Sequence, residues 1–66
     1  MDKKVIGERL KNLRGDKTIK EVAVVLGISY STLAMYENGY RVPKDEIKRK
    51  LANYYQTSVE DLFFTA

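Results

Sequence analysis

The chain has 66 residues, no cysteine, no histidine and a formal net charge of +3 at pH 7. This length allows one domain over residues 1–66, and the missing residue types exclude disulfide bonds, thiolate metal sites and histidine general bases. No apolar run approaches the roughly 20 residues that span a bilayer, and residues 1–5 do not begin a signal peptide. The sequence therefore predicts a cytoplasmic protein that uses no membrane, metal ion or cofactor.

Charge is distributed unevenly along the chain. Residues 1–50 hold all 12 Lys and Arg together with seven of the nine acids, whereas residues 51–66 hold two acids and no base. A basic body with an apolar, slightly acidic tail indicates one side that faces a polyanion and another that packs. A charge of +3 is also typical of an ordinary solvated surface, so charge alone does not decide between the two.

The first expected helix covers residues 2–14. Apolar residues recur in it at the spacing of one helical face, and they are Ile6, Leu10 and Leu13. The Gly-Asp-Lys sequence of residues 15–17 then stops the helix.

The second expected helix covers residues 18–26. Thr18 and Glu21 form a capping box, in which each side chain bonds a backbone N–H at the helix start. Residues 22–26 alone would also suit a strand. The cap before them, Gly27 after them and the lack of a partner strand favour a helix.

The third expected helix starts after Ser29, whose hydroxyl can cap it, and runs to about Glu37. Asn38 and Gly39 end it, because both tolerate the left-handed backbone found at helix ends. Two short helices joined by a three-residue turn with a glycine predict a helix-turn-helix over residues 18–37.

The side chains of this segment suit such packing. Ala23 is small enough for a close crossing of the two helices, and Ile28 in the turn faces inward. Leu33 fills the space beside Val22 and Leu26.

A fourth helix is expected to start at Pro43, with Asp45 and Glu46 in its first turn. Its apolar face holds Ile47, Leu51, Tyr54 and Tyr55. A last short helix follows the Thr-Ser pair of residues 57–58, and its apolar face holds Val59, Leu62 and Phe63.

Taken jointly and at these spacings, the residues resemble the phage-repressor and Cro type of helix-turn-helix regulator, also called the xenobiotic-response-element type. The resemblance extends over residues 6–63. It rests on Ile6-Gly7-Glu8-Arg9-Leu10, Leu13-Arg14, Thr18, Val22-Ala23, Leu26-Gly27-Ile28-Ser29, Leu33, Tyr36-Glu37-Asn38-Gly39, Pro43, Leu51-Ala52 and Val59 to Leu62.

The resemblance implies a compact all-α domain of five helices whose third helix lies in the major groove of DNA. It implies base contacts from Tyr30, Ser31, Ala34 and Met35, with Thr32 at the edge. It implies phosphate contacts from Thr18, Lys20, Asn38, Tyr40, Arg41 and Lys44. It also implies an ion pair between Arg14 and Glu37 that links the first helix to the third.

The chain departs from the family pattern in three places. Ile19 stands where the family often has a Gln that bonds phosphate or a base, which leaves the neighbouring Lys20 as the substitute. The base-contacting positions lack Gln, Asn and Arg, so apolar contact with thymine methyl groups is expected there. Val24 and Val25 lie where charged residues are usual, either as scattered exposed side chains or as a patch for a partner.

The sequence therefore predicts a bacterial or phage-encoded transcriptional repressor that binds double-stranded DNA, at a short palindromic operator, as a homodimer. Phe64, which is expected to have no intramolecular role, is the candidate dimer contact. The alternative is a protein-interaction module, such as an antitoxin or an accessory subunit. An enzyme is disfavoured because no nucleophile–base pair and no phosphate-cradling glycine loop is present.

Overall fold

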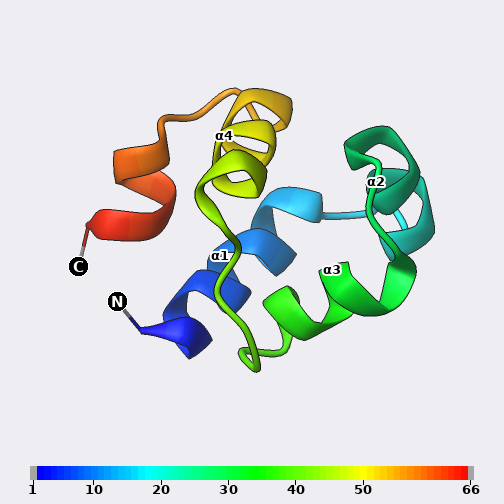
Figure 1. The fold of residues 1–66 in the computed structure, drawn as a ribbon, viewed down its shortest axis with the longest axis horizontal. Helices are drawn as coiled ribbons and strands as arrows, with labels where there is room; N and C mark the ends of the chain where they lie inside the picture. The colour runs from blue at the N-terminus through cyan, green and yellow to red at the C-terminus, as the bar shows by residue number, and fades with distance from the viewer. Residues whose placement is uncertain (1, 66) are drawn as a thin grey trace.

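A computed structural model describes residues 2–65, which fold into four α-helices and a π-helical turn. These elements are α1 (Lys3–Arg14), α2 (Ile19–Leu26), α3 (Tyr30–Glu37), α4 (Asp45–Tyr54) and η1 (Glu60–Phe64). In Figure 1, α1 crosses the middle of the molecule, α3 lies below it, α2 lies at the right and α4 lies above. The predicted all-α fold with five helices is confirmed, and the helix-turn-helix is formed by α2 and α3.

Asp2, which the sequence analysis placed inside the first helix, is instead the N-cap of α1. The Asp2 carboxylate accepts hydrogen bonds from the backbone N–H groups of Lys4 at 2.9 Å and Val5 at 3.4 Å. An acceptor here satisfies donors that have no partner within the helix. Gly15, with a φ of 57°, ends the helix as expected.

The cap of α2 is only half of the predicted capping box. The Thr18 hydroxyl accepts a hydrogen bond from the backbone N–H of Glu21 at 3.1 Å. Within residues 2–65 the exposed Glu21 side chain makes no hydrogen bond in return. Gly27 ends the helix in the left-handed conformation, with a φ of 72°.

The ends of α3 also follow the expected pattern. The Ser29 hydroxyl accepts from the N–H of Thr32 at 3.1 Å. Asn38 keeps a φ of −87°, and Gly39 alone takes the left-handed conformation, with a φ of 78°. The prediction that Pro43 begins the next helix is wrong, since α4 starts two residues later, at Asp45.

The core draws buried apolar side chains from every element. They are Ile6, Leu10, Val22, Ala23, Leu26, Leu33, Tyr36, Leu51, Ala52, Leu62 and Phe63. Leu13 was expected among them but is exposed. The reason is that α1 turns its Gly7 face towards α3, and this rotation carries Leu13 to the edge of the buried stripe.

The C-terminal turn is held against α1 by one long side chain. Arg9 donates to the backbone oxygens of Asp61 at 3.3 Å, Leu62 at 3.1 Å and Thr65 at 2.6 Å. These carbonyls belong to η1 and its C-cap, and the Asp61 oxygen also accepts from the Thr65 hydroxyl at 2.9 Å. Arg9 therefore joins the start of the fold to its end.

No single helix in residues 2–65 has the length and apolarity to cross a membrane. The pair α2 and α3 would pass on length and composition together, but it bends by 112° at the turn between them.

Candidate nucleic-acid interface

The bend between α2 and α3 gives the geometry of a helix-turn-helix. The two helices meet at 112° across residues 27–29, within the range of such motifs. Ala23 is 2% exposed, so a larger side chain would force the helices apart. Ile28 is half-buried against the core, as predicted.

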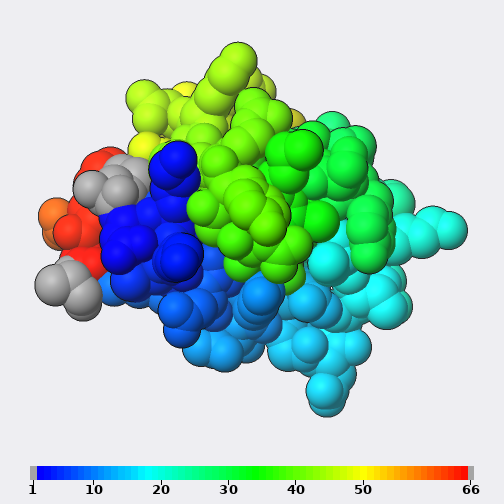
Figure 2. All heavy atoms as spheres, turned by 90° about the horizontal axis from the view of Figure 1, so that it is seen from below, coloured from blue at the N-terminus to red at the C-terminus, as the bar shows by residue number. Residues whose placement is uncertain are grey.

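One face of α3 is anchored in the core and the other is free. Leu33 and Tyr36 are buried, as predicted, whereas Tyr30 and Met35 are 60% and 41% exposed. Figure 2 shows the free face: α3 in green and the loop after it in yellow-green occupy the centre, and the start of α2 in cyan lies beside them. The exposed face of α3, which carries Tyr30 and Met35, is called the ridge below. The start of α2 and the loop after α3 lie on the same side of the molecule as this ridge.

The hydroxyl groups at the start of α3 bond one another. The Ser29 hydroxyl donates to Oγ1 of Thr32 at 2.8 Å and lies 3.2 Å from Oγ of Ser31. Ser31 is exposed, while Thr32 and Ala34 are half-buried. The hydroxyls of Ser29 and Thr32 are therefore engaged with each other at the start of α3.

The side chains expected at phosphates lie at the start of α2 and on the segment between α3 and α4. Lys20, Asn38, Tyr40, Arg41 and Lys44 are exposed, while the Thr18 hydroxyl is already bonded as the cap of α2. Among residues 2–65, neither Arg41 nor Lys44 has an acidic partner within 4.0 Å. Unpaired cations beside an exposed helix are available to an external anion.

Arg14 and Glu37 lie in contact. Nε of Arg14 is 2.9 Å from Oε2 and 3.1 Å from Oε1 of Glu37, and the carboxylate is buried. Arg14 also donates through Nη1 to the backbone oxygen of Lys17 at 2.6 Å. The hydrogen bond to Glu37 raises the pKa of Arg14 above its ordinary value. The pair joins the end of α1 to the end of α3.

Tyr55 packs beside this pair, and its hydroxyl was not anticipated. The Tyr55 hydroxyl is buried and has no hydrogen-bond partner among residues 2–65. Burial raises the pKa of Tyr55 to about 12, and the negative charge of Glu37 adds to the effect. Because folding raises this pKa from 10.0, the unfolded chain loses the phenol proton at a lower pH than the folded chain does. The stability linked to the neutral phenol is therefore complete below pH 10 and is lost as the pH rises through about 12.

Gly7 allows α1 and α3 to touch through their backbones. A Cβ atom at this position would collide with the backbone oxygen of Glu37 and would lie 2.9 Å from that of Tyr36. The sequence carried a signal for this contact, because glycine inside a helix costs about 1 kcal/mol against alanine and usually has a packing reason. The contact sets the distance between α1 and α3.

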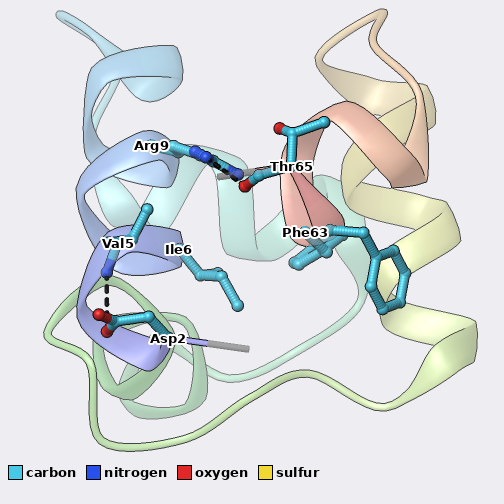
Figure 3. Close-up of a pocket in the computed structure, with 7 residues that line it drawn as sticks. Asp2, Val5, Ile6, Arg9, Phe63 and Thr65 are labelled. Carbon is cyan, nitrogen blue, oxygen red and sulfur yellow. Dashed lines mark hydrogen bonds between the residues drawn. The ribbon is translucent and has the colours of Figure 1, made fainter.

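A pocket of about 580 Å³ lies between the start of α1 and the C-terminal turn, and Figure 3 shows it. Its apolar lining includes Val5 and Phe64, and Phe64 is 59% exposed. The expectation that Phe64 has no intramolecular role is wrong, because the ammonium of Lys48 lies 5.0 Å from its ring centroid and 5.7 Å from that of Phe63. Lys48 is itself almost completely buried, since its aliphatic stem packs while its charge faces the rings.

Comparison with known proteins agrees with this geometry. The family model described as helix-turn-helix matches residues 8–62. The HTH-type transcriptional regulator AnsR of Bacillus subtilis (strain 168) is 40% identical over 57 residues, which cover 83% of this chain and 49% of the relative. The chain thus spans about half the length of this relative. No solved structure is a significant match. The chain belongs to the Cro/C1-type family of helix-turn-helix DNA-binding proteins.

Proposed function

We propose that the chain is a sequence-specific DNA-binding transcriptional regulator that places α3 in the major groove. The observation that carries this function is the exposed ridge of α3 with the unpaired cations Arg41 and Lys44 on the loop beside it. An α-helix fits the major groove, and cations next to it neutralise phosphates. The similarity to a transcriptional regulator of Bacillus subtilis supports the same function.

Base readout in this proposal is mainly apolar. Ala34 and Met35 face thymine methyl groups, and Tyr30 reaches a base edge or a nearby phosphate from the start of α3. Without bidentate donors, the usual discrimination of roughly 1–3 kcal/mol per base pair is lost at most positions. Part of the specificity then comes from DNA shape at base pairs that the protein does not touch.

Arg41→Ala should weaken binding to every DNA sequence by a similar factor. One lost phosphate contact reduces the slope of log affinity against log salt concentration by about 0.9. Mobility shifts at several salt concentrations measure the slope, with Arg49→Ala, an exposed arginine on α4, as the matched control. An unchanged slope in Arg41→Ala would place this side chain away from phosphate. Failure of the unmodified chain to bind any DNA at low salt would favour the protein-interaction module instead.

A repressor that acts as a homodimer on a short palindromic operator is the finer form of this proposal. One recognition helix with so few hydrogen-bonding groups specifies too little sequence, whereas two copies read half-sites roughly 34 Å apart. Phe64 and Val5 on the rim of the C-terminal pocket offer the apolar surface for such a contact. Lys48 orients the Phe64 ring from inside the fold.

Phe64→Ser should shift the chain towards monomer in sedimentation experiments, because it removes the most exposed aromatic group of the pocket. Loss of the Lys48 contact should cost only about 0.5–1 kcal/mol of stability, so the fold survives. Leu13→Ser is the matched control, an exposed apolar residue that does not line the pocket and lies about one turn beyond Arg9, the last α1 residue that does. If Phe64→Ser and the unmodified chain sediment equally with DNA present, the dimer contact does not involve Phe64.

A further inference from the structure

Two consecutive valines of α2 carry apolar surface that the domain does not use. Val24 and Val25 are 71% and 65% exposed, on a helix whose buried residues are Val22, Ala23 and Leu26. Valine is also a poorer helix former than the Lys, Glu or Ala suited to exposed helical positions. Neither the packing nor the helix propensity of the isolated domain explains this pair.

Val25 borders a shallow pocket between α2 and α4. The pocket has a volume of about 230 Å³, and its lining residues are Val25, Leu26, Lys50, Asn53 and Tyr54. Small-molecule sites are usually larger, at roughly 300–1,000 Å³, and enclose their ligand. The size suits one or two side chains presented by a larger partner.

Positive charge flanks this pocket. The ammonium of Lys50 lies 3.5 Å from the backbone oxygen of Leu26. The ammonium of Lys17 donates to the Tyr54 hydroxyl at 3.2 Å and lies 4.9 Å from the centroid of that ring. None of the lining residues is acidic, and Glu21, one turn before Val25, is the nearest acid along α2. An apolar floor with two ammonium groups at its edge is complementary to an acidic, amphipathic segment.

We propose that this pocket and the Val24–Val25 pair form a docking surface for an acidic amphipathic helix of a partner protein. Apolar side chains one turn apart on that helix pack on the valines and enter the pocket, and its carboxylates face Lys50 and Lys17. The pocket lies between α2 and α4, whereas the DNA-binding groups proposed above are on α3, at the start of α2 and on the loop after α3. Val24 follows Lys20, a proposed phosphate contact, by one turn of α2, so Val25 and the pocket, and not Val24, are the part of the surface that partner binding can use without displacing DNA.

A synthetic peptide provides the probe. It is a helix-forming chain of about four turns with leucines on one face and glutamates on the other. Titrated into the isotopically labelled protein, it should shift the methyl signals of Val24 and Val25 in a saturable manner. The same peptide with lysines in place of glutamates should bind more weakly, since only the charge facing Lys50 and Lys17 has changed.

Two variants of the protein test the surface directly. Lys50→Glu should weaken the acidic peptide about fivefold, whereas Lys11→Glu, the same reversal at an exposed site on α1, should not. Val25→Asp should abolish the shift of the Val24 methyl signals while leaving circular dichroism and DNA mobility shifts unchanged. If DNA binding fails in the unmodified chain, the function proposed above falls while the peptide result still stands.

Three results would overturn the docking surface. One is the absence of saturable shifts at about millimolar peptide. Another is self-association of the free chain that Val25→Asp removes, which would make a second copy the occupant. The third is a parallel loss of DNA affinity in Val25→Asp and Lys50→Glu, which would assign the surface to DNA.

Discussion

Gly7→Ala should lower the free energy of unfolding by about 2–3 kcal/mol, although alanine is the better helix former. The added Cβ meets backbone atoms of Glu37 and Tyr36, which cannot rotate away as a side chain would. Overpacking of this kind costs about 3 kcal/mol, and the gain in helix propensity returns no more than about 1 kcal/mol. The melting temperature should fall by about 10–20 °C.

Thermal denaturation followed by circular dichroism measures this effect. Gly27→Ala is the matched control, because a Cβ at Gly27 meets no atom within 4 Å and strains only the left-handed backbone, at about 1–2 kcal/mol. DNA affinity should fall in Gly7→Ala as well, since separating α1 from α3 displaces the ridge. A melting temperature equal to that of the unmodified chain would mean that the two backbones are not in contact.

Glu37→Ala should lower the free energy of unfolding by about 3 kcal/mol and weaken DNA binding at the same time. The substitution leaves Arg14 partly buried beside Tyr55 with no counter-charge, and uncompensated charges of this kind are expensive. The Arg14 side chain keeps 21% exposure, so water recovers part of the loss. DNA affinity falls because the end of α3 loses its bond to α1.

A double-mutant cycle isolates this ion pair from its surroundings. Arg14→Met combined with Glu37→Met should recover stability relative to either single substitution, since no charge is then left buried. Glu60→Ala, at an exposed acid on η1, serves as the control for loss of a carboxylate. Additive effects of the two single substitutions would show that Arg14 and Glu37 act separately.

Local sequence signals were sufficient for most of the secondary structure. Thr18 and Ser29 cap the helices that they were expected to cap, and Gly27 and Gly39 carry the left-handed turns. Such signals depend on neighbours within a few residues, so one sequence reveals them. Leu13 was misplaced because its burial depends on how far α1 rotates against α3, which residues distant in the sequence determine.

Less of the candidate site than of the helices could be predicted from the sequence. The resemblance supplied the Arg14–Glu37 pair, whereas no local pattern indicated that Lys48 lies under Phe64 or that Tyr55 buries an unbonded hydroxyl. A lysine among charged residues is typical of a solvated face, and a tyrosine on an apolar stripe is typical of a core. The first interpretation fails for Lys48, whereas the second holds for Tyr55 but does not reveal that its hydroxyl lacks a partner, because contacts across the fold decide both outcomes.

The division of α3 into an anchored side and a free side has an evolutionary consequence. Leu33, Tyr36 and Glu37 hold the helix, while Tyr30 and Met35 touch little of the fold. Exchanges at exposed positions usually change stability by no more than about 0.5 kcal/mol. Under the proposed function, one copy of a duplicated gene can therefore acquire a new DNA target through substitutions at these few positions. No compensating change in the scaffold is needed, so the DNA sites that are bound can diverge faster than the fold.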